Sequence, residues 1–322
     1  MKMIMKAVIL LIVVLKVSNT LWGDEKKSSL SGDLIIFHAG SLAVPFKEIS
    51  EKFNQEYPNV RILCESAGSR TCARKISDLE RQCDVMASAD YTIIDELLIP
   101  EHADWNLKFA SNEMSIVYSN ASRRAKEINR DNWYNILLDE NVIFGRSNPN
   151  IDPCGYRAVL TIKLAEEFYR QPGLAQKLLS KDINFMRPKE VDLLALLETN
   201  NIDYIFLYRS VAQQHGLKFI RLPDEINLKK PKLSDFYNKA SIKISGKKPG
   251  TFIVKTGEPM VYGITIPRNA PNPIAALEFV KFLCEKDKGL AILERNGQPS
   301  MVPSSTNTYN QLPEDLKKYA TR

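Results

Sequence analysis

The chain has 322 residues, of which 44% are hydrophobic and 25% charged, a balance that excludes a disordered chain, a collagen-like repeat and a disulfide-dense mini-protein. The length is typical of about two domains. The formal net charge is +6, but Lys2, Lys6 and Lys16 lie in the first 23 residues, which contain no acid, so 41 basic residues face 38 acidic ones from Asp24 onward. So small an excess predicts no binding to nucleic acid or to a membrane surface.

Residues 1–23 have the pattern of a secretory signal peptide. Lys2 and Lys6 precede the apolar run Ala7–Leu15, and small and polar residues follow Lys16. As a helix this run spans about 14 Å, too short for a hydrocarbon core of about 30 Å. We therefore expect an exported protein on the periplasmic or extracellular side of the cytoplasmic membrane, with an uncleaved N-terminal anchor as the alternative.

From residue 33 onward, short apolar runs alternate with stretches of helical period, which predicts an α/β fold of mainly parallel sheets flanked by helices. We expect two lobes, one of residues 30–117 plus 263–322 and the other of residues 118–262, with chain crossings near residues 118 and 261–267. The expected strands are 33–37, 60–64, 84–87, 114–118, 142–144 and 204–208. The expected helices are 42–57, 72–79, 158–169, 191–197 and 273–285, and a surface hairpin is expected around 246–254.

Four strand-to-helix junctions carry residues suited to binding an anion. They are 38–42 (HAGSL), 67–69 (AGS), 152–157 (DPCGYR) and 188–192 (PKEVD). Each of them alone is explained by a helix cap or by an acid near a helix dipole. Together they are more informative, because open α/β sheets bind ligands at the carboxyl ends of their strands, where helix N-termini offer free N–H groups. Two such turns in each lobe indicate an anion site between the lobes.

The chain resembles the extracellular tungstate- and molybdate-binding proteins of ABC importers. The resemblance is carried in the family's order by HAGSLAVPF, AGS, SADY, SNPNIDPCGYRA, LETNNIDYIFLYRSVAQQHG and NGQPSMVP, from about residue 35 to about residue 303. It implies a two-lobed type II periplasmic-binding-protein fold with the oxyanion in the cleft. The implied ligand is tungstate or molybdate, with no cofactor. The implied partner is a permease with its ATPase, and we expect a monomer.

The resemblance also assigns the ligand-binding residues. They are Gly40, Ser41 and Ser69 in the first lobe and Asp152, Pro153, Cys154, Glu190 and Tyr208 in the second. Cys154 contributes either only its backbone N–H or a thiol that faces the ligand. Asp152 and Glu190 are the implied ligands of the metal atom, in a six-coordinate arrangement.

Two acids in an anion site need a physical reason. A carboxylate at about 4 Å from an anion, at an effective dielectric near 20, costs about 4 kcal/mol per charge pair. Mo(VI) and W(VI) can expand from four oxygen ligands to six, whereas the sulfur of sulfate cannot, so carboxylates suit a metal oxyanion. In the alternative interpretation, Asp152 and Glu190 only cap helices and point away from the ligand.

An exported hydrolase is the main alternative of another class. The three histidines are His38, His102 and His215, and the sequence has no GxSxG, HExxH, Walker or GxGxxG motif. We therefore expect a binding protein rather than an enzyme. Other binding functions stay open: a sulfate, thiosulfate or phosphate receptor, an Fe(III) receptor that uses Tyr156 and Tyr208, or a signalling receptor.

The cysteines are Cys64, Cys72, Cys83, Cys154 and Cys284, and no pair forms a CxxC motif. Export makes disulfides possible. An odd number with these spacings favours small buried side chains over a zinc or redox site.

Overall fold

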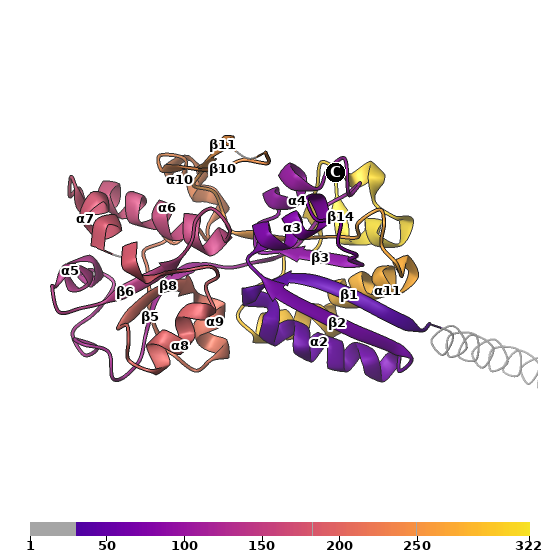
Figure 1. Ribbon diagram of the computed structural model, residues 1–322, viewed down its shortest axis with the longest axis horizontal. Helices are drawn as coiled ribbons and strands as arrows, with labels where there is room; N and C mark the ends of the chain where they lie inside the picture. The colour runs from indigo at the N-terminus through magenta and orange to yellow at the C-terminus, as the bar shows by residue number, and fades with distance from the viewer. Residues whose placement is uncertain (1–29, 182, 249) are drawn as a thin grey trace, which may run out of the picture.

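The computed structural model describes residues 30–181, 183–248 and 250–322, so the predicted signal peptide at 1–23 lies outside the described residues. Two lobes lie side by side, each built on one five-stranded sheet (Figure 1). In the part of the chain that is described, none of the helices has the length and apolar character needed to span a membrane.

The first lobe is built on a sheet with the strand order β2-β1-β3-β12-β4. Its strands are β1 (Gly32–Ala39), β2 (Val60–Ala67), β3 (Val85–Ser88), β4 (Leu107–Ser111) and β12 (Val261–Thr265). Its helices are α2 (Ala43–Glu56), α3 (Ser69–Ser77), α4 (Thr92–Leu97), α11 (Pro273–Cys284) and α12 (Ala291–Arg295). The core lies on both faces of the sheet because alternate residues of β1 point to opposite sides. Leu34 and Ile36 pack with α2 and α11, whereas Phe37 packs with α3 and α4.

The second lobe is built on a sheet with the order β7-β6-β8-β5-β9. Its strands are β5 (Met114–Tyr118), β6 (Phe144–Ser147), β7 (Met186–Arg187), β8 (Tyr204–Tyr208) and β9 (Lys218–Arg221). Its helices are α5 (Trp133–Leu138), α6 (Pro153–Phe168), α7 (Leu174–Lys181), α8 (Asp192–Glu198), α9 (Arg209–Gln214) and α10 (Ser234–Tyr237). Helix α6 packs closely on β6, since a Cβ added at Gly155 would lie 2.5 Å from the Ser147 carbonyl oxygen.

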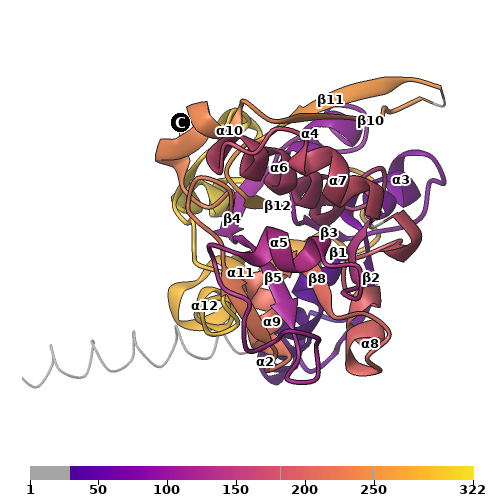
Figure 2. The same ribbon diagram turned by 90° about the vertical axis from the view of Figure 1, so that its left-hand side faces the viewer.

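Short elements complete the fold. The predicted surface hairpin is present as the antiparallel pair β10 (Ser241–Ser245) and β11 (Phe252–Thr256). The others are β13 (Ser304–Ser305), β14 (Ala320–Thr321), the π-helical η4 (Lys286–Leu290) and the 3-10 turns η1 (Gly40–Leu42), η2 (Ile183–Phe185), η3 (Pro231–Leu233), η5 (Tyr309–Gln311) and η6 (Glu314–Tyr319). Figure 2 shows the hairpin along the top of the molecule, beside α4 of the first lobe.

The two-lobed α/β fold with mainly parallel sheets is confirmed, and in each sheet a single strand runs against the others. In the first sheet β1 runs parallel to β2 and β3, while β12 runs antiparallel to β3 and β4. In the second sheet β6 runs parallel to β7 and β8, while β5 runs antiparallel to β8 and β9. The antiparallel pairs arise where the chain enters a lobe from the other one, since β5 and β12 both follow a crossing.

The first crossing between the lobes lies earlier in the chain than predicted, because strand β5 belongs to the second sheet. Strand β5 pairs only within the second sheet, although the predicted boundary at 117/118 assigned it to the first lobe. The chain therefore passes between the sheets at residues 112–113 and again at 257–260. The apolar pattern of β5 fits either sheet equally well, so the sequence does not reveal which partners it takes. Apart from this strand, the division into 30–117 plus 263–322 and 118–262 stays a prediction.

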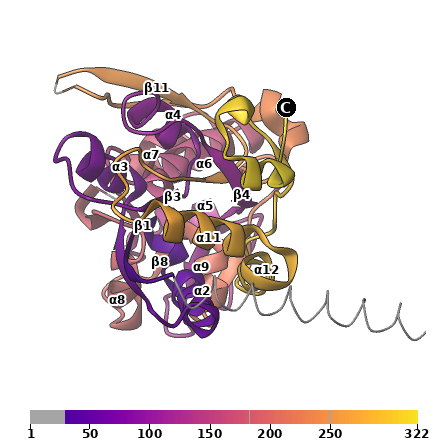
Figure 3. The same cartoon turned by 90° about the vertical axis from the view of Figure 1, so that its right-hand side faces the viewer.

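Helices α2 and α11 both belong to the first lobe (Figure 3), and an aromatic cluster joins them. The ring of Phe279 lies 5.9 Å from that of Phe46 and 5.4 Å from that of Phe53, both in edge-on arrangements.

We expect Phe279→Ala to lower the free energy of unfolding by about 3–5 kcal/mol, because it leaves a cavity in this cluster. Urea unfolding followed by circular dichroism measures the change. Ile274→Ala, on the same helix but exposed, is the control, and equal midpoints for the two variants would contradict the prediction.

Candidate functional site

The eight predicted site residues are all buried, at the ends of strands where the two lobes face each other. In the first lobe, Gly40 and Ser41 follow β1 and Ser69 begins α3 after β2. The second-lobe residues lie at the start of α6, before α8 and at the end of β8 (Asp152, Pro153, Cys154, Glu190 and Tyr208). The arrangement is the expected one for an open α/β sheet, with helix starts gathered at the carboxyl ends of the strands.

Asp152 and Glu190 lie side by side within the second lobe. Asp152 is the N-cap of α6, and its Oδ1 accepts a hydrogen bond of 3.3 Å from the Cys154 N–H. Its Oδ2 accepts a hydrogen bond of 3.0 Å from the Glu190 N–H. The two carboxyl groups are 2% and 1% exposed as residues. Asp152 therefore caps a helix, as the alternative interpretation required, and also holds the Glu190 backbone beside it.

Two glycines of the first lobe allow the lobes to meet over this pair. A Cβ added at Gly40 would lie 3.0 Å from Oε1 of Glu190, and one added at Gly68 would lie 2.5 Å from the Ile151 carbonyl oxygen and 3.3 Å from Cβ of Asp152. Oε2 of Glu190 is buried and has no hydrogen-bond partner among the described residues. An unpaired buried carboxyl oxygen is costly, so this atom remains available to a further bonding partner.

Burial controls the ionisation of both acids. It raises the pKa of Asp152, and it raises the pKa of Glu190 well above its ordinary value, with the neighbouring Asp152 carboxylate adding to the effect. Two carboxyl groups that share one buried site cannot both ionise without a large cost. In the absence of a ligand, the pair therefore retains a proton to a higher pH than isolated acids do.

The site hydroxyls bond to protein groups behind them. The Ser69 hydroxyl oxygen accepts a hydrogen bond of 2.9 Å from the Ala89 N–H. The Tyr208 hydroxyl accepts one of 3.1 Å from Nη1 of Arg157. The Ser41 hydroxyl lies 2.9 Å from that of Tyr262. All three hydroxyls are thus held in place by neighbours from outside the predicted set.

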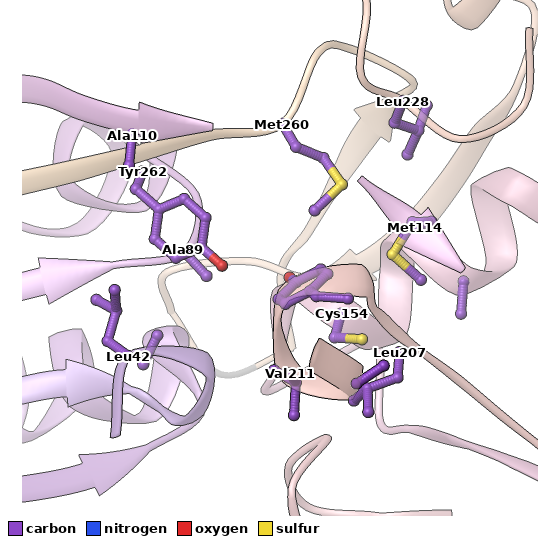
Figure 4. Close-up of a cluster of buried hydrophobic side chains, with 14 of the residues drawn as sticks. Leu42, Ala89, Ala110, Met114, Cys154, Leu207, Val211, Leu228, Met260 and Tyr262 are labelled. Carbon is purple, nitrogen blue, oxygen red and sulfur yellow. The ribbon is translucent and has the colours of Figure 1, made fainter. Parts of the chain in front are cut away.

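Cys154 and Pro153 lie at the start of α6. Pro153 occupies the first helical position, where its missing N–H is not needed. The Cys154 thiol lies 3.7 Å from the Phe206 carbonyl oxygen, within a cluster of buried hydrophobic side chains (Figure 4). Burial raises the pKa of this thiol well above its ordinary value. The role of Cys154 at the ligand stays a prediction.

Sequence reasoning missed Asn112 and Tyr262, which lie where the chain crosses between the lobes. Nδ2 of Asn112 donates to the Tyr262 hydroxyl at 2.9 Å and to the Ser210 hydroxyl at 2.7 Å. These bonds connect the first crossing, the second crossing and the start of α9. The one feature of the sequence that could have indicated Tyr262 is its place within the predicted crossing at 261–267.

His38 does not form a catalytic pair with Ser41 in this arrangement. Its Nδ1 lies 2.8 Å from the Ala39 carbonyl oxygen, and its ring packs against Phe46 at 5.3 Å. Burial lowers the pKa of His38. The Ser41 hydroxyl bonds to Tyr262 instead. His38 is therefore a packed strand residue in this arrangement.

The five cysteines are free thiols, and four of them are buried, as predicted for small core residues; the exception is Cys64.

Further contacts join the lobes beside the site through the β10–β11 hairpin. Nη2 of Arg70 in α3 donates to the Ser245 carbonyl oxygen at 2.5 Å. Nζ of Lys255 in β11 lies 2.6 Å from the Thr92 hydroxyl and 2.5 Å from Oε1 of Glu96 in α4. The hairpin packs on α6 of the second lobe, so these bonds join the two lobes.

A family model for bacterial extracellular solute-binding proteins matches residues 34–298, and the chain belongs to that family. A solute-binding protein of Petrotoga mobilis is 48% identical over 291 residues, which cover 90% of each chain. The molybdate/tungstate-binding protein WtpA of Pyrococcus abyssi is 40% identical over 323 residues, 92% of each chain. The structure of the Azotobacter vinelandii periplasmic molybdate-binding protein has the same fold, with a TM-score of 0.62 at 14% identity over 82% of this chain and 98% of that one. The resemblance carried by the sequence motifs is thereby confirmed.

The proton shared by the buried acids makes stability depend on pH. The folded pair has raised pKa values, so the native state binds more protons than the unfolded chain, whose carboxyl groups titrate near about 4.3. Without oxyanion, we expect the free energy of unfolding to fall as the pH rises above that value, and Glu190→Gln to reduce this fall. Urea midpoints at about pH 5 and about pH 8 measure it.

Glu140→Gln, which removes an exposed acid, is the control for the loss of one carboxyl group. If the midpoint of Glu190→Gln fell with pH as steeply as that of the parent, the buried pair would not hold the proton.

Proposed function

We propose that the protein captures tungstate or molybdate outside the cytoplasmic membrane and delivers it to the permease of an ABC importer energised by its ATPase. The observation that carries the proposal is the buried pair Asp152 and Glu190, which faces the glycine and serine turns of the other lobe. The WtpA relative, named as a molybdate/tungstate-binding protein, supports the choice of ligand.

The two carboxyl groups favour a metal oxyanion over sulfate or phosphate. Facing a dianion, each ionised carboxylate would cost several kcal/mol unless it bonds to the central atom. Mo(VI) and W(VI) accept two further oxygen ligands, so Asp152 and Glu190 would complete a six-coordinate metal. The hydroxyl groups of Ser41, Ser69 and Tyr208 and the N–H groups at the helix starts would donate to the remaining oxo groups.

Closure of the lobes would complete the binding site. The acids and Tyr208 belong to the second lobe, and the two serines belong to the first. Only the closed arrangement makes both sets of contacts, so the oxyanion would shift the population toward it. The closed form is then the one that a permease has to recognise.

The Fe(III) alternative has less support from the tyrosines. The Tyr156 hydroxyl donates to the Asp90 carboxylate, and the Tyr208 hydroxyl accepts from Arg157. Burial raises the pKa of both phenols well above the ordinary value. An iron-binding tyrosinate requires the opposite shift.

We expect tungstate and molybdate to bind one-to-one in calorimetric titration, without competition from excess sulfate. Asp152→Asn and Glu190→Gln should each weaken tungstate binding by roughly 100-fold or more, because each removes a metal ligand. Asp192→Asn, two residues beyond Glu190 but partly exposed and paired with Lys189, is the matched control.

Unchanged affinity in both site variants would rule out metal coordination by the acids. Competition by sulfate would indicate a general anion site. The absence of heat with every oxyanion would overturn the proposed ligand.

The proposed closure of the lobes predicts that a side chain added at Gly68 weakens tungstate binding. In Gly68→Ala, the new methyl group would meet the Ile151 carbonyl oxygen at 2.5 Å, a backbone atom that cannot rotate away. We expect weaker tungstate binding and a smaller decrease in radius of gyration with tungstate, measured by small-angle X-ray scattering. Ligand-free thermal unfolding should match the parent, since the clash exists only when the lobes meet. Parent-like compaction and affinity would contradict this.

A further inference from the structure

We propose that Arg157 is a positioning residue for the bound oxyanion, because it turns the hydroxyl proton of Tyr208 toward the ligand. Arg157 lies in the DPCGYR segment but is outside the predicted site, where the sequence suggests only an ion pair with a nearby acid. The inference rests on the proposed oxyanion binding, and the experiment below separates the two.

Arg157 is buried on α6 and reaches across to the first lobe. Its Nη1 donates to the Tyr208 hydroxyl at 3.1 Å and to the Ala89 carbonyl oxygen at 2.6 Å. Its Nη2 lies 3.8 Å from Oδ2 of Asp90. The guanidinium group therefore contacts one ligand-binding side chain of its own lobe and two consecutive residues of the other lobe.

The direction of the Tyr208 proton follows from the chemistry of arginine. A guanidinium group has donors and no acceptor, so the Tyr208 oxygen must accept in this bond. The Tyr208 proton then needs a different acceptor. Among the described residues, Arg157 is the one hydrogen-bond partner of this hydroxyl. An oxo group of the anion is the acceptor that this geometry leaves available.

The same arrangement occurs at Ser69. Its hydroxyl oxygen accepts from the Ala89 N–H, so its proton is also left for the ligand. At Ser41, the hydroxyl lies 2.9 Å from that of Tyr262, and either of the two can be the donor. At Tyr208 and Ser69, a donor behind the hydroxyl makes that hydroxyl a donor toward the site. Arg157 is the member of this second layer that carries a charge.

Asp90 holds Arg157 in place and makes the arrangement depend on closure. Asp90 follows β3 in the first lobe, and its Oδ1 accepts from the Thr92 N–H at 3.0 Å and from the Thr92 hydroxyl at 2.9 Å. Burial alone would raise the pKa of Asp90, but Lys255 and Arg157 lower it overall, so the carboxylate is ionised. Arg157 meets this carboxylate only when the lobes are together. Closure therefore aligns the Tyr208 proton at the same time as it encloses the ligand.

A double-mutant cycle on tungstate affinity tests the proposal. Arg157→Lys keeps the charge beside Asp90, but an ammonium group cannot reproduce the planar fork that reaches both Tyr208 and Ala89. We expect Arg157→Lys and Tyr208→Phe each to weaken binding roughly tenfold. Combined with Tyr208→Phe, Arg157→Lys should cost less than about twofold, since the hydroxyl that it positions is gone. Arg123→Lys, at an Arg–Asp pair remote from the cleft, is the control and should bind as the parent does.

The outcomes separate the inference from the proposed function. Failure of the parent protein to bind any oxyanion overturns the proposed function, and the inference with it. If the parent binds and Arg157→Lys costs the same factor with and without the Tyr208 hydroxyl, the positioning role is overturned while the function stands.

If Arg157→Lys folds poorly, a measurement on the parent protein tests the proposal instead. With tyrosines labelled with carbon-13 at Cζ, the Tyr208 resonance, assigned through Tyr208→Phe, should shift when tungstate is added, because its hydroxyl begins to donate to the anion. A Tyr208 resonance unmoved by saturating tungstate would show that the proton does not point to the ligand and would overturn the proposal.

Discussion

The burial of two carboxyl groups side by side is the constraint on which the rest of the site depends. Asp152 and Glu190 cannot both carry a charge in that position at low cost, and they are enclosed by backbone at Gly40 and Gly68 rather than by side chains. The glycines, the helix start at Pro153 and the meeting of the lobes all serve this enclosure. A central atom that takes carboxylate oxygen as a ligand relieves the cost, and for that reason the pair supports tungstate or molybdate as the proposed ligand.

Beside the site, the cationic side chain of Arg157 lies behind the neutral hydroxyl group of Tyr208. The guanidinium group of Arg157 faces the carboxylate of Asp90 and donates to the hydroxyl of Tyr208. In the proposed complex, neutral hydroxyl and N–H groups of both lobes donate to the oxo groups. The proposed contacts of both lobes are then made together only while the lobes are closed, and they are lost when the lobes part.

Local sequence patterns predicted about half of the strands and helices, and the elements that they missed have a physical explanation. The strand β1, the helix α2 and the hairpin β10–β11 follow from residue period and turn residues. Many short elements were missed because they are stabilised by packing against distant parts of the chain. Among them are strands β4, β7 and β9 and helices α4, α5, α7, α9, α10 and α12. The pairing of β5 was assigned to the wrong sheet because an apolar strand fits either one.

The sequence by itself determined the class of protein, the helix starts and the eight candidate residues, since these depend on local chemistry and on motifs that resemble a family. Only the tertiary structure decided which residues are in contact with each other. It brought Glu190 against Gly40, turned the Cys154 thiol into the core, and put Arg157 between Tyr208 and Asp90. These contacts join residues about 50 to 150 positions apart, and no local pattern encodes them, because each depends on the packing of whole elements and on the closure of two lobes.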